Sequence, residues 1–358
     1  MTQIPVNPPF DQQAWLDGEL RRQLTMVDEA SRPNFSPLAM QMKNIELMAL
    51  NIKYFGFELA RRLATEMPVR QSLSYAPVGL GWKPSTQVDL ESEWCAYWCA
   101  ELKIPVVFHR KVWEFVYFLQ ALAENGVLES GRRGLGFGCG EEPLASYLAA
   151  RGVQTTVTDL SGEEAASAGW RMTGQHLAVL ESAYKSYLVE RDAFDACVTH
   201  RFVDMNAIPE DLIDYDFCWS ICALEHLGSI EQAMQFVKNA MATLKPGGFA
   251  IHTTEFNFLN DVETLDNWPT VLPQRRHFEA LAESLRAEGH EVGSLDFNVG
   301  TKPLDRFIDI PPYPGDAGQK LERMGAHGDS NHLKLSIDGF ASTCFGLIIR
   351  RNAAEVDA

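Results

Sequence analysis

Residues 133–161 read RGLGFGCGEEPLASYLAARGVQTTVTDLS, and this stretch decides the fold. A short apolar run ends at Phe137, Gly138 and Gly140 then form a tight turn before a predicted helix, and a second apolar run ends at Asp159. Glycines let a ligand approach the backbone closely, and a carboxylate at the end of the second strand can accept bonds from both ribose hydroxyls. The stretch therefore predicts a nucleotide site at the carboxyl edge of a parallel sheet.

The glycine turn fits two cofactor families, which its neighbouring residues distinguish. A dinucleotide site uses a Gly-x-Gly-x-x-Gly turn, whose helix N-terminus meets a pyrophosphate. None of the three candidate windows ends in glycine, because their last residues are Cys139, Glu141 and Pro143. Glu141 and Glu142, at the start of the helix, would repel a pyrophosphate but suit a ligand with a cationic amino group and a sulfonium. The turn therefore favours S-adenosylmethionine over NAD(P), whose binding would indicate an oxidoreductase.

Beyond this stretch, short apolar runs alternate with helical segments, which predicts a parallel sheet with helices on both faces. The five predicted parallel strands cover 134–137, 155–158, 198–203, 217–221 and 249–253. Two further runs, 291–299 and 344–350, have no helix between them and are predicted to close the sheet as an antiparallel pair. The predicted fold class is therefore α/β, a doubly wound, mostly parallel seven-stranded sheet with an antiparallel C-terminal strand.

The first third of the chain is predicted to be helical and to pack on the sheet domain. We expect a mainly helical N-terminal extension over 1–125 and a cofactor-binding domain over 126–358, with a long loop or lid at 300–335. Apolar residues at helical spacing form one stripe in the extension: Ile45, Met48, Ile52, Phe55, Leu59 and Leu63. A further helix is predicted over 108–125.

The composition is that of a globular protein, with 46% hydrophobic and 22% charged residues over 358 positions. The formal net charge of −17 repels phosphate backbones, so broad nucleic-acid binding is not expected. No stretch reaches the roughly 18 apolar residues of a membrane span, and the N-terminus lacks the basic and apolar regions of a signal peptide. The seven cysteines show no Cys-x-x-Cys spacing, which predicts reduced thiols and a cytoplasmic location.

Five motifs occur in the order typical of class I S-adenosylmethionine-dependent methyltransferases, and residues 130–260 resemble that family. The glycine turn resembles its first motif, although Gly136 stands where the family has an acid and Glu142 where it has a third glycine. The later motifs resemble residues at 159–160, 203–206, 216–227 and 244–248. The resemblance implies that the cofactor is bound by Gly136, Gly138, Gly140, Glu142, Asp159, Leu160, Asp204, Met205 and Ser220. A narrower resemblance is to a little-described bacterial group of methyltransferases.

Methyl transfer is an in-line displacement at a sulfonium carbon, and a hydroxyl acceptor must also lose a proton. The candidate catalytic bases lie at or just beyond the carboxyl ends of the fourth and fifth predicted strands, and they are His226, His252 and Glu255. Three structural alternatives stay open: a capping role for Glu255, a core role for His252, and a structural role or a loop contact to the cofactor side for the pair Glu225 and His226.

A divalent metal is an alternative way to assist the reaction. The loop after the fourth strand is similar to the Glu-x-x-Glu-His metal motif of small-RNA 2′-O-methyltransferases. Cys222 replaces the first Glu of that motif, while Glu225 and His226 match it, and His277 is a further candidate ligand. Hard divalent ions prefer oxygen ligands, so the missing Glu disfavours a metal.

These features predict S-adenosylmethionine-dependent O-methylation of a small polar acceptor, such as a sugar hydroxyl in glycan or secondary-metabolite biosynthesis. The polar content of 300–335 favours a hydroxyl-bearing substrate. The alternative from another class is a non-catalytic S-adenosylmethionine-binding sensor or partner subunit. The sequence leaves the acceptor atom and the oligomeric state open.

Overall fold

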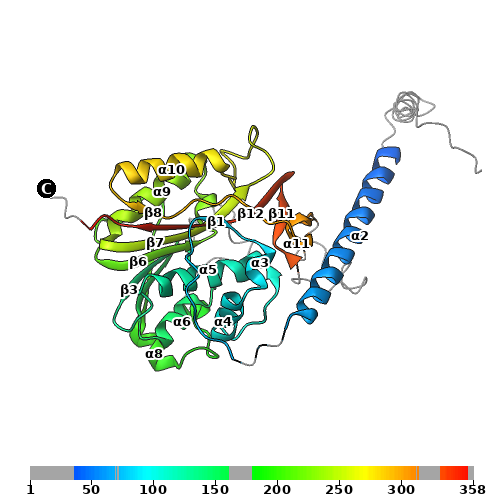
Figure 1. Cartoon of the computed structure of the whole chain (residues 1–358). Coiled ribbons are helices and arrows are strands. Elements are labelled where there is room, and N and C mark those ends of the chain that lie inside the picture. The colour runs from blue at the N-terminus through cyan, green and yellow to red at the C-terminus, as the bar shows by residue number, and fades with distance from the viewer. Residues whose placement is uncertain are drawn as a thin grey trace, which may run out of the picture.

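The structure is a computed structural model that describes residues 36–68, 70, 72–160, 180–311, 313 and 331–353. Eight strands form the main path of one sheet: β3 (Arg133–Phe137), β4 (Gln154–Asp159), β5 (Val198–Phe202), β6 (Tyr215–Ile221), β7 (Leu244–Asn257), β9 (Ile308–Asp309), β11 (Lys334–Ile337) and β12 (Phe340–Arg350). Their order is β5-β4-β3-β6-β7-β12-β11-β9. Figure 1 shows β6, β7 and β12 side by side in this sheet. The strands from β5 to β7 are parallel, whereas β12 is antiparallel to β7. The predicted fold class is confirmed, and all five predicted parallel strands are present.

The strand pairing on the edge of β12 opposite β7 differs from the prediction. Of residues 291–299, only β8 (Glu291–Val292) pairs with β12, and Leu295 forms an isolated bridge with Trp82. The rest of that edge pairs with β1 (Lys83–Pro84) and with β11. The prediction of a full strand over 291–299 is therefore wrong, because three short strands share the edge that one strand was expected to cover.

Helices cover both faces of the sheet (Figure 1). One face carries α4 (Glu93–Glu101), α5 (Arg110–Glu124), α6 (Leu144–Ala150) and α8 (Arg191–Cys197), and the other carries α9 (Ile230–Ala240) and α10 (Arg275–Ala287). Each face has its own hydrophobic core, as the buried rings of Phe118 and Trp219 on the first face and of Phe236 and Phe345 on the second show. The shorter elements are α3 (Gln87–Leu90), α11 (Pro303–Arg306), the pair β2 (Phe108–His109) and β10 (Asn331–His332), and 3-10 turns at Leu180–Ala183, Leu224–His226 and Met241–Thr243.

Packing is continuous across the predicted boundary between residues 125 and 126. The helix α5 lies against β6, β7 and β12, and its Trp113, Tyr117 and Phe118 are fully buried. The strand β1 is hydrogen-bonded to β12. Residues 83–124 thus pack directly on the sheet.

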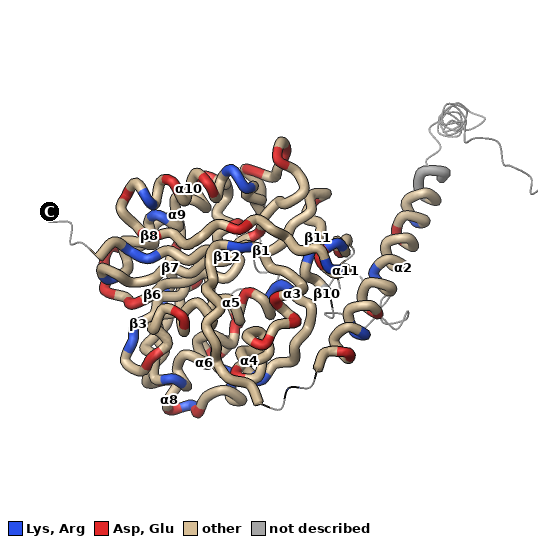
Figure 2. The backbone as a smooth tube through the Cα atoms, in the orientation of Figure 1, with Lys and Arg blue, Asp and Glu red and all other residues tan. Residues whose placement is uncertain are grey.

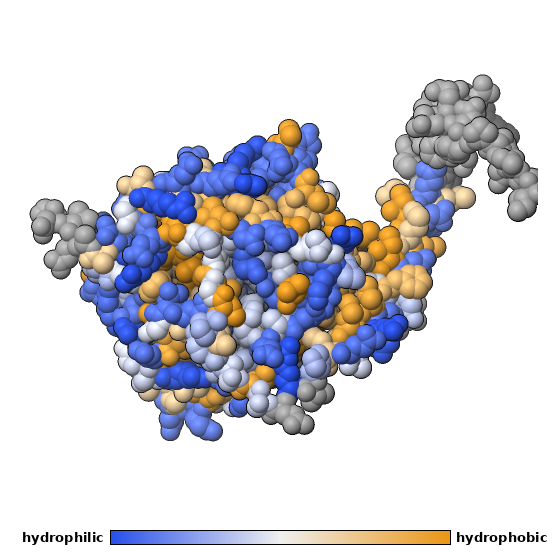
Figure 3. Space-filling model, in the orientation of Figure 1, coloured by the Kyte–Doolittle hydropathy of each residue, from blue (hydrophilic) through white to orange (hydrophobic). Residues whose placement is uncertain are grey.

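The helix α2 (Ser36–Glu66) extends from the side of the sheet structure (Figure 1). Its buried face includes Lys53, Phe57 and Ala60, and Lys53 Nζ pairs with Asp309 Oδ1 at 2.5 Å. Five residues of the predicted apolar stripe are instead exposed by 37% to 70%: Ile45, Met48, Ile52, Phe55 and Leu59. The expectation that this stripe packs on the domain is therefore wrong. Figure 3 shows hydrophobic side chains along this projecting helix.

The structure describes only part of the segment that was predicted to be a long loop or lid. Of 300–335, the structure describes α11, β9 and β10, while residues 314–330 lie outside the described part of the chain.

No helix within the described residues is both long and apolar enough to cross a membrane. Acidic and basic residues are interspersed along the elements around the sheet, as Figure 2 shows.

Candidate active site

A cavity of about 680 Å³ lies at the carboxyl ends of β3, β4 and β6. These ends meet because the three strands are parallel neighbours, and open α/β sheets bind ligands at this edge. Eight of the predicted site residues line the cavity: Gly138, Gly140, Glu142, Asp159, Leu160, Asp204, Met205 and His226. The structure thus brings together residues that span 89 positions of the chain, from 138 to 226.

The two glycines of the turn are required by backbone geometry. Gly138 has φ +59° and Gly140 has φ +50°, a left-handed region that side chains rarely adopt. A Cβ on Gly138 would also lie 2.7 Å from Cβ of Ala223 in the loop after β6. The turn therefore brings backbone up to the cavity where a side chain would not fit.

Two carboxylates lie at the cavity wall: Asp159 at the carboxyl end of β4 and Asp204 just beyond the carboxyl end of β5. The Asp159 carboxylate accepts from the backbone N–H of Gly140 at 3.2 Å and from that of Leu160 at 2.9 Å, which holds it at the end of β4. Asp204 is exposed at the rim, and its Oδ1 accepts from the Asn206 N–H at 2.8 Å. Both carboxylates are thus oriented by backbone donors on the side of the sheet where a nucleoside would lie.

Glu142 has an unusual position for a carboxyl group. Its Oε2 is out of contact with solvent and has no hydrogen-bond partner among the described residues. Burial raises the pKa of Glu142 well above its usual value, and Glu114 and Asp159 raise it further against the opposing effect of Lys111. A buried polar atom without a partner is unfavourable, so this carboxyl fits a ligand that brings a hydrogen-bond donor. The ammonium of S-adenosylmethionine is such a donor, and the residues present fit that cofactor.

Gly136, Ser220 and His252 do not line the cavity, in contrast to the prediction. A Cβ on Gly136 would lie 2.3 Å from Cys139 Sγ and 2.4 Å from the Trp219 ring, so this glycine serves packing within the sheet. Ser220 Oγ is hydrogen-bonded to His252 Nδ1 at 2.8 Å, and both side chains are fully buried.

Burial also removes His252 from the candidate bases. It lowers the pKa of His252 to about 3, and the ring packs edge-on against Phe236 in the core. His252 is therefore a core histidine, which was the open alternative, and its assignment as a base is corrected.

Glu255 is buried beside the cavity rather than in its wall. Its carboxylate forms an ion pair with Arg110 and accepts from Ser342 Oγ at 2.6 Å. A carboxylate with both a cation and a hydroxyl as partners is poorly suited to take a proton from an acceptor. Its surroundings favour a structural role over the predicted catalytic one.

His226 lies in the cavity wall, in the turn after β6. Its Nδ1 lies 2.9 Å from the carbonyl oxygen of Pro269, which only accepts, so Nδ1 carries the proton. Burial lowers the pKa of His226, against the opposing effect of Glu225, whose Oε1 lies 3.9 Å from Nε2. The imidazole is therefore neutral near pH 7, with its basic lone pair on Nε2.

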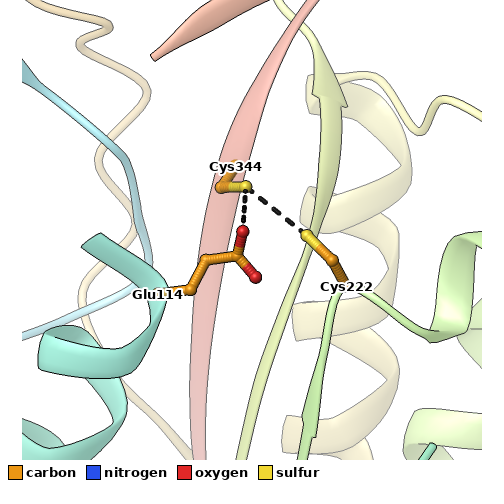
Figure 4. Close-up of side chains that lie close together, drawn as sticks. All are labelled: Glu114, Cys222 and Cys344. Atoms are coloured by element: carbon orange, nitrogen blue, oxygen red, sulfur yellow. Dashed lines mark hydrogen bonds between the residues drawn. The ribbon is translucent and has the colours of Figure 1, made fainter. Parts of the chain in front are cut away.

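A cluster of Glu114, Cys222 and Cys344, which reaches the cavity wall through Cys222, joins three elements that are distant in sequence (Figure 4). Cys222 Sγ and Cys344 Sγ are 3.4 Å apart, and Cys344 Sγ donates to Glu114 Oε1 at 2.9 Å. Burial raises the pKa of both thiols. Arg110 Nη1 lies 3.7 Å and 3.8 Å from the two sulfur atoms. The sequence carries no local signal for this cluster, since no motif links Glu114 to Cys344.

The metal candidates are not brought together as predicted. Glu225 groups with Cys222 and Glu255, whose ligand atoms lie within 4.8 Å of one another. His277 belongs instead to α10, where its Nδ1 accepts from the Gln274 N–H at 2.9 Å and it lines a separate hollow beside α9. In the part of the chain that the structure describes, His277 is thus a helix-capping residue, and its assignment as a ligand beside Glu225 is corrected.

The sheet, the glycine turn and the cavity define a class I S-adenosylmethionine-dependent methyltransferase. Residues 112–294, just over half of the chain, match the family model described as a methyltransferase domain, and the chain belongs to this family.

Individual relatives are distant. A malonyl-acyl-carrier-protein O-methyltransferase of Erwinia billingiae is 29% identical over 116 residues, which are 32% of this chain and 44% of that protein. The chain thus matches less than half the length of this curated relative. Among solved structures, a phosphoethanolamine N-methyltransferase of Haemonchus contortus is 17% identical with a TM-score of 0.40, over 65% of this chain and 52% of its own. A methyltransferase of Aquifex aeolicus is 14% identical with a TM-score of 0.32, over 65% and 88%.

Proposed function

We propose that this methyltransferase transfers the methyl group of S-adenosylmethionine to an oxygen atom of a small polar acceptor, with His226 as the base. The observation that carries the proposal is the neutral, oriented imidazole in the wall of the cofactor cavity. The bond to Pro269 fixes the tautomer, so Nε2 is the atom that takes the acceptor proton. The cofactor supplies an electrophilic methyl group when it is bound.

The lining of the cavity supports a polar acceptor. Lys185 and Asn206 contribute polar side chains to the cavity wall that also contains His226. Apolar contacts come from residues such as Ile104 and Phe115, as in most small-molecule sites. The curated relative is an O-methyltransferase, which also favours oxygen as the acceptor atom. We retain a sugar hydroxyl as the proposed acceptor group.

The seven cysteines support a cytoplasmic location for the reaction. All of them are free thiols, including the close pair Cys222 and Cys344. Thiols at this proximity persist in a reducing compartment.

The first experiment supplies S-adenosylmethionine with a labelled methyl group and a panel of hydroxyl- and carboxylate-bearing small molecules. A product whose label resists mild base is an ether and supports a hydroxyl acceptor, while a base-labile label identifies an ester. Binding of S-adenosylhomocysteine with no labelled product from any acceptor would instead favour the sensor or partner subunit.

The second experiment tests the base. Replacing His226 with Ala should lower turnover by about 10²- to 10⁴-fold while S-adenosylhomocysteine affinity stays within a few-fold. His277→Ala is the matched control, since His277 lies outside the cavity, and its turnover should be unchanged. Equal turnover for both variants would contradict the role of His226.

The pH profile gives an independent check. The neutral form of His226 is the active base, and its pKa lies below the ordinary histidine value of about 6.5. Turnover should therefore be full at neutral pH and fall as the pH drops through the histidine pKa. The profile of His226→Gln should lack this acid limb.

A further inference from the structure

We propose that Glu142 and Lys111 hold the amino-acid end of S-adenosylmethionine, with Glu142 facing its ammonium and Lys111 its carboxylate. In this chain the pair replaces the acid that the first motif lacks at Gly136. The inference rests on the cofactor assignment and is independent of the acceptor and of His226.

The end of β3 has no room for the missing acid. A Cβ at Gly136 would already lie 2.3 Å from Cys139 Sγ and 2.4 Å from the Trp219 ring, before any carboxylate is added. The partner of a cationic ligand group must therefore come from another position in the turn.

The two acids of the turn are not equivalent. Glu141 is exposed, so water already solvates its carboxylate. Glu142 Oε2 is buried at the cavity wall and lacks a hydrogen-bond partner among the described residues. A desolvated carboxyl gains most from a charged donor, because hydrogen bonds to charged groups are the stronger ones.

Lys111 provides the opposite charge on the same cavity. It lies in the first turn of α5, and its Nζ lies 3.4 Å from Glu114 Oε2 and 3.3 Å from the Ile221 carbonyl oxygen, both long for hydrogen bonds. Glu114 does not depend on Lys111 alone, since Thr253 Oγ1 also donates to it at 3.0 Å. The ammonium of Lys111 is thus near the cavity without being held by a short bond.

The arrangement matches a zwitterion. Lys111 forms its ion pair with Glu114, and among the described residues it forms none with Glu142, on which it acts only at longer range. A ligand that carries an ammonium and a carboxylate on one carbon satisfies both residues at once. A dinucleotide has no such pair of charges, so these two residues also select against it.

The test compares two ligands by calorimetry. S-adenosylhomocysteine has the amino-acid end, whereas 5′-methylthioadenosine keeps the adenosine and thioether but lacks it. Glu142→Gln and Lys111→Met should each weaken S-adenosylhomocysteine at least about tenfold and leave 5′-methylthioadenosine within a few-fold. Glu141→Gln is the matched variant, and it should change neither affinity.

Two outcomes would overturn the proposal. One is that Glu142→Gln weakens both ligands by the same factor or weakens neither. The other is that Glu141→Gln, and not Glu142→Gln, causes the selective loss.

If a variant fails to fold, a second measurement tests the proposal on the unaltered chain. An S-adenosylhomocysteine analogue without the amino group, and one without the carboxylate, should each bind at least about tenfold more weakly than the parent. Equal affinity of the parent and both analogues would equally overturn the proposal.

Discussion

The helices α2 and α5 both carry apolar residues at helical spacing, but those of α5 are buried, whereas the predicted stripe of α2 is largely exposed. α5 lies against the sheet, and Trp113, Tyr117 and Phe118 are fully buried. α2 turns Lys53 and Phe57 toward the rest of the molecule and leaves Phe55 70% exposed. An apolar stripe therefore shows that a helix has a hydrophobic face, but not that this face meets the domain's own core.

The same comparison separates the functional contributions of the two helices. α5 begins beside the cofactor cavity, where Arg110 pairs with Glu255 and Lys111 lines the wall. α2 reaches the buried interior through Lys53, whose ammonium pairs with Asp309. The helix next to the sheet thus supplies groups to the site, while α2 is attached by a buried ion pair.

The largest expected effect is that of Phe118→Ala in α5. This ring lies 5.4 Å from the ring of Trp219, centroid to centroid, and is fully buried. Its removal should lower the free energy of unfolding by about 3–5 kcal/mol, measured by chemical denaturation. A loss below about 1 kcal/mol would show that α5 is not part of the core.

The next effect is the loss of stability in acid that follows from the burial of a neutral His252 in the same sheet. The folded-state pKa of about 3 lies below the unfolded value of about 6.5, so the unfolded chain binds the extra proton between these pH values. Stability is full above pH 6.5 and should fall by up to about 1.4 kcal/mol per pH unit as the pH drops toward 3. Denaturation of the wild type and of His252→Gln at several pH values isolates this contribution. Parallel pH profiles for the two proteins would show that the ring is not held neutral in the core.

A smaller effect, on binding rather than on folding, is expected at the cofactor edge. Asp159→Ala removes a carboxylate that two backbone N–H groups hold at the end of β4. S-adenosylhomocysteine affinity should fall at least about tenfold by calorimetry, while the loss of the two backbone hydrogen bonds should lower the melting temperature of the ligand-free protein by only about a few degrees. Unaltered affinity would remove Asp159 from the binding site.

The smallest effect is expected for Phe55→Ser in α2. The ring is exposed in the folded chain, so its removal should change the free energy of unfolding by less than about 0.5 kcal/mol. Phe118→Ala is the comparison on a buried aromatic ring. A loss of several kcal/mol for Phe55→Ser would mean that the exposed stripe is covered in solution.

The sequence by itself determined the features that depend on local geometry. Short apolar runs that alternate with helical segments located the five parallel strands, because the strands of a parallel sheet are covered by helices on both faces. Gly138 and Gly140 marked the turn, because their left-handed backbone excludes most other residues. The parallel order of those strands then placed Asp159 and Asp204 at one edge, and both line the cavity.

Only the tertiary structure decided which side chains meet across long stretches of chain. The pairing of Cys222 with Cys344, the burial of His252, the exposure of the α2 stripe and the burial of Glu142 Oε2 next to an exposed Glu141 all depend on neighbours from other elements. Residue type and spacing indicate the local conformation of a segment. Burial and charge partners arise only when segments pack, and they set the pKa and hydrogen bonding of each group.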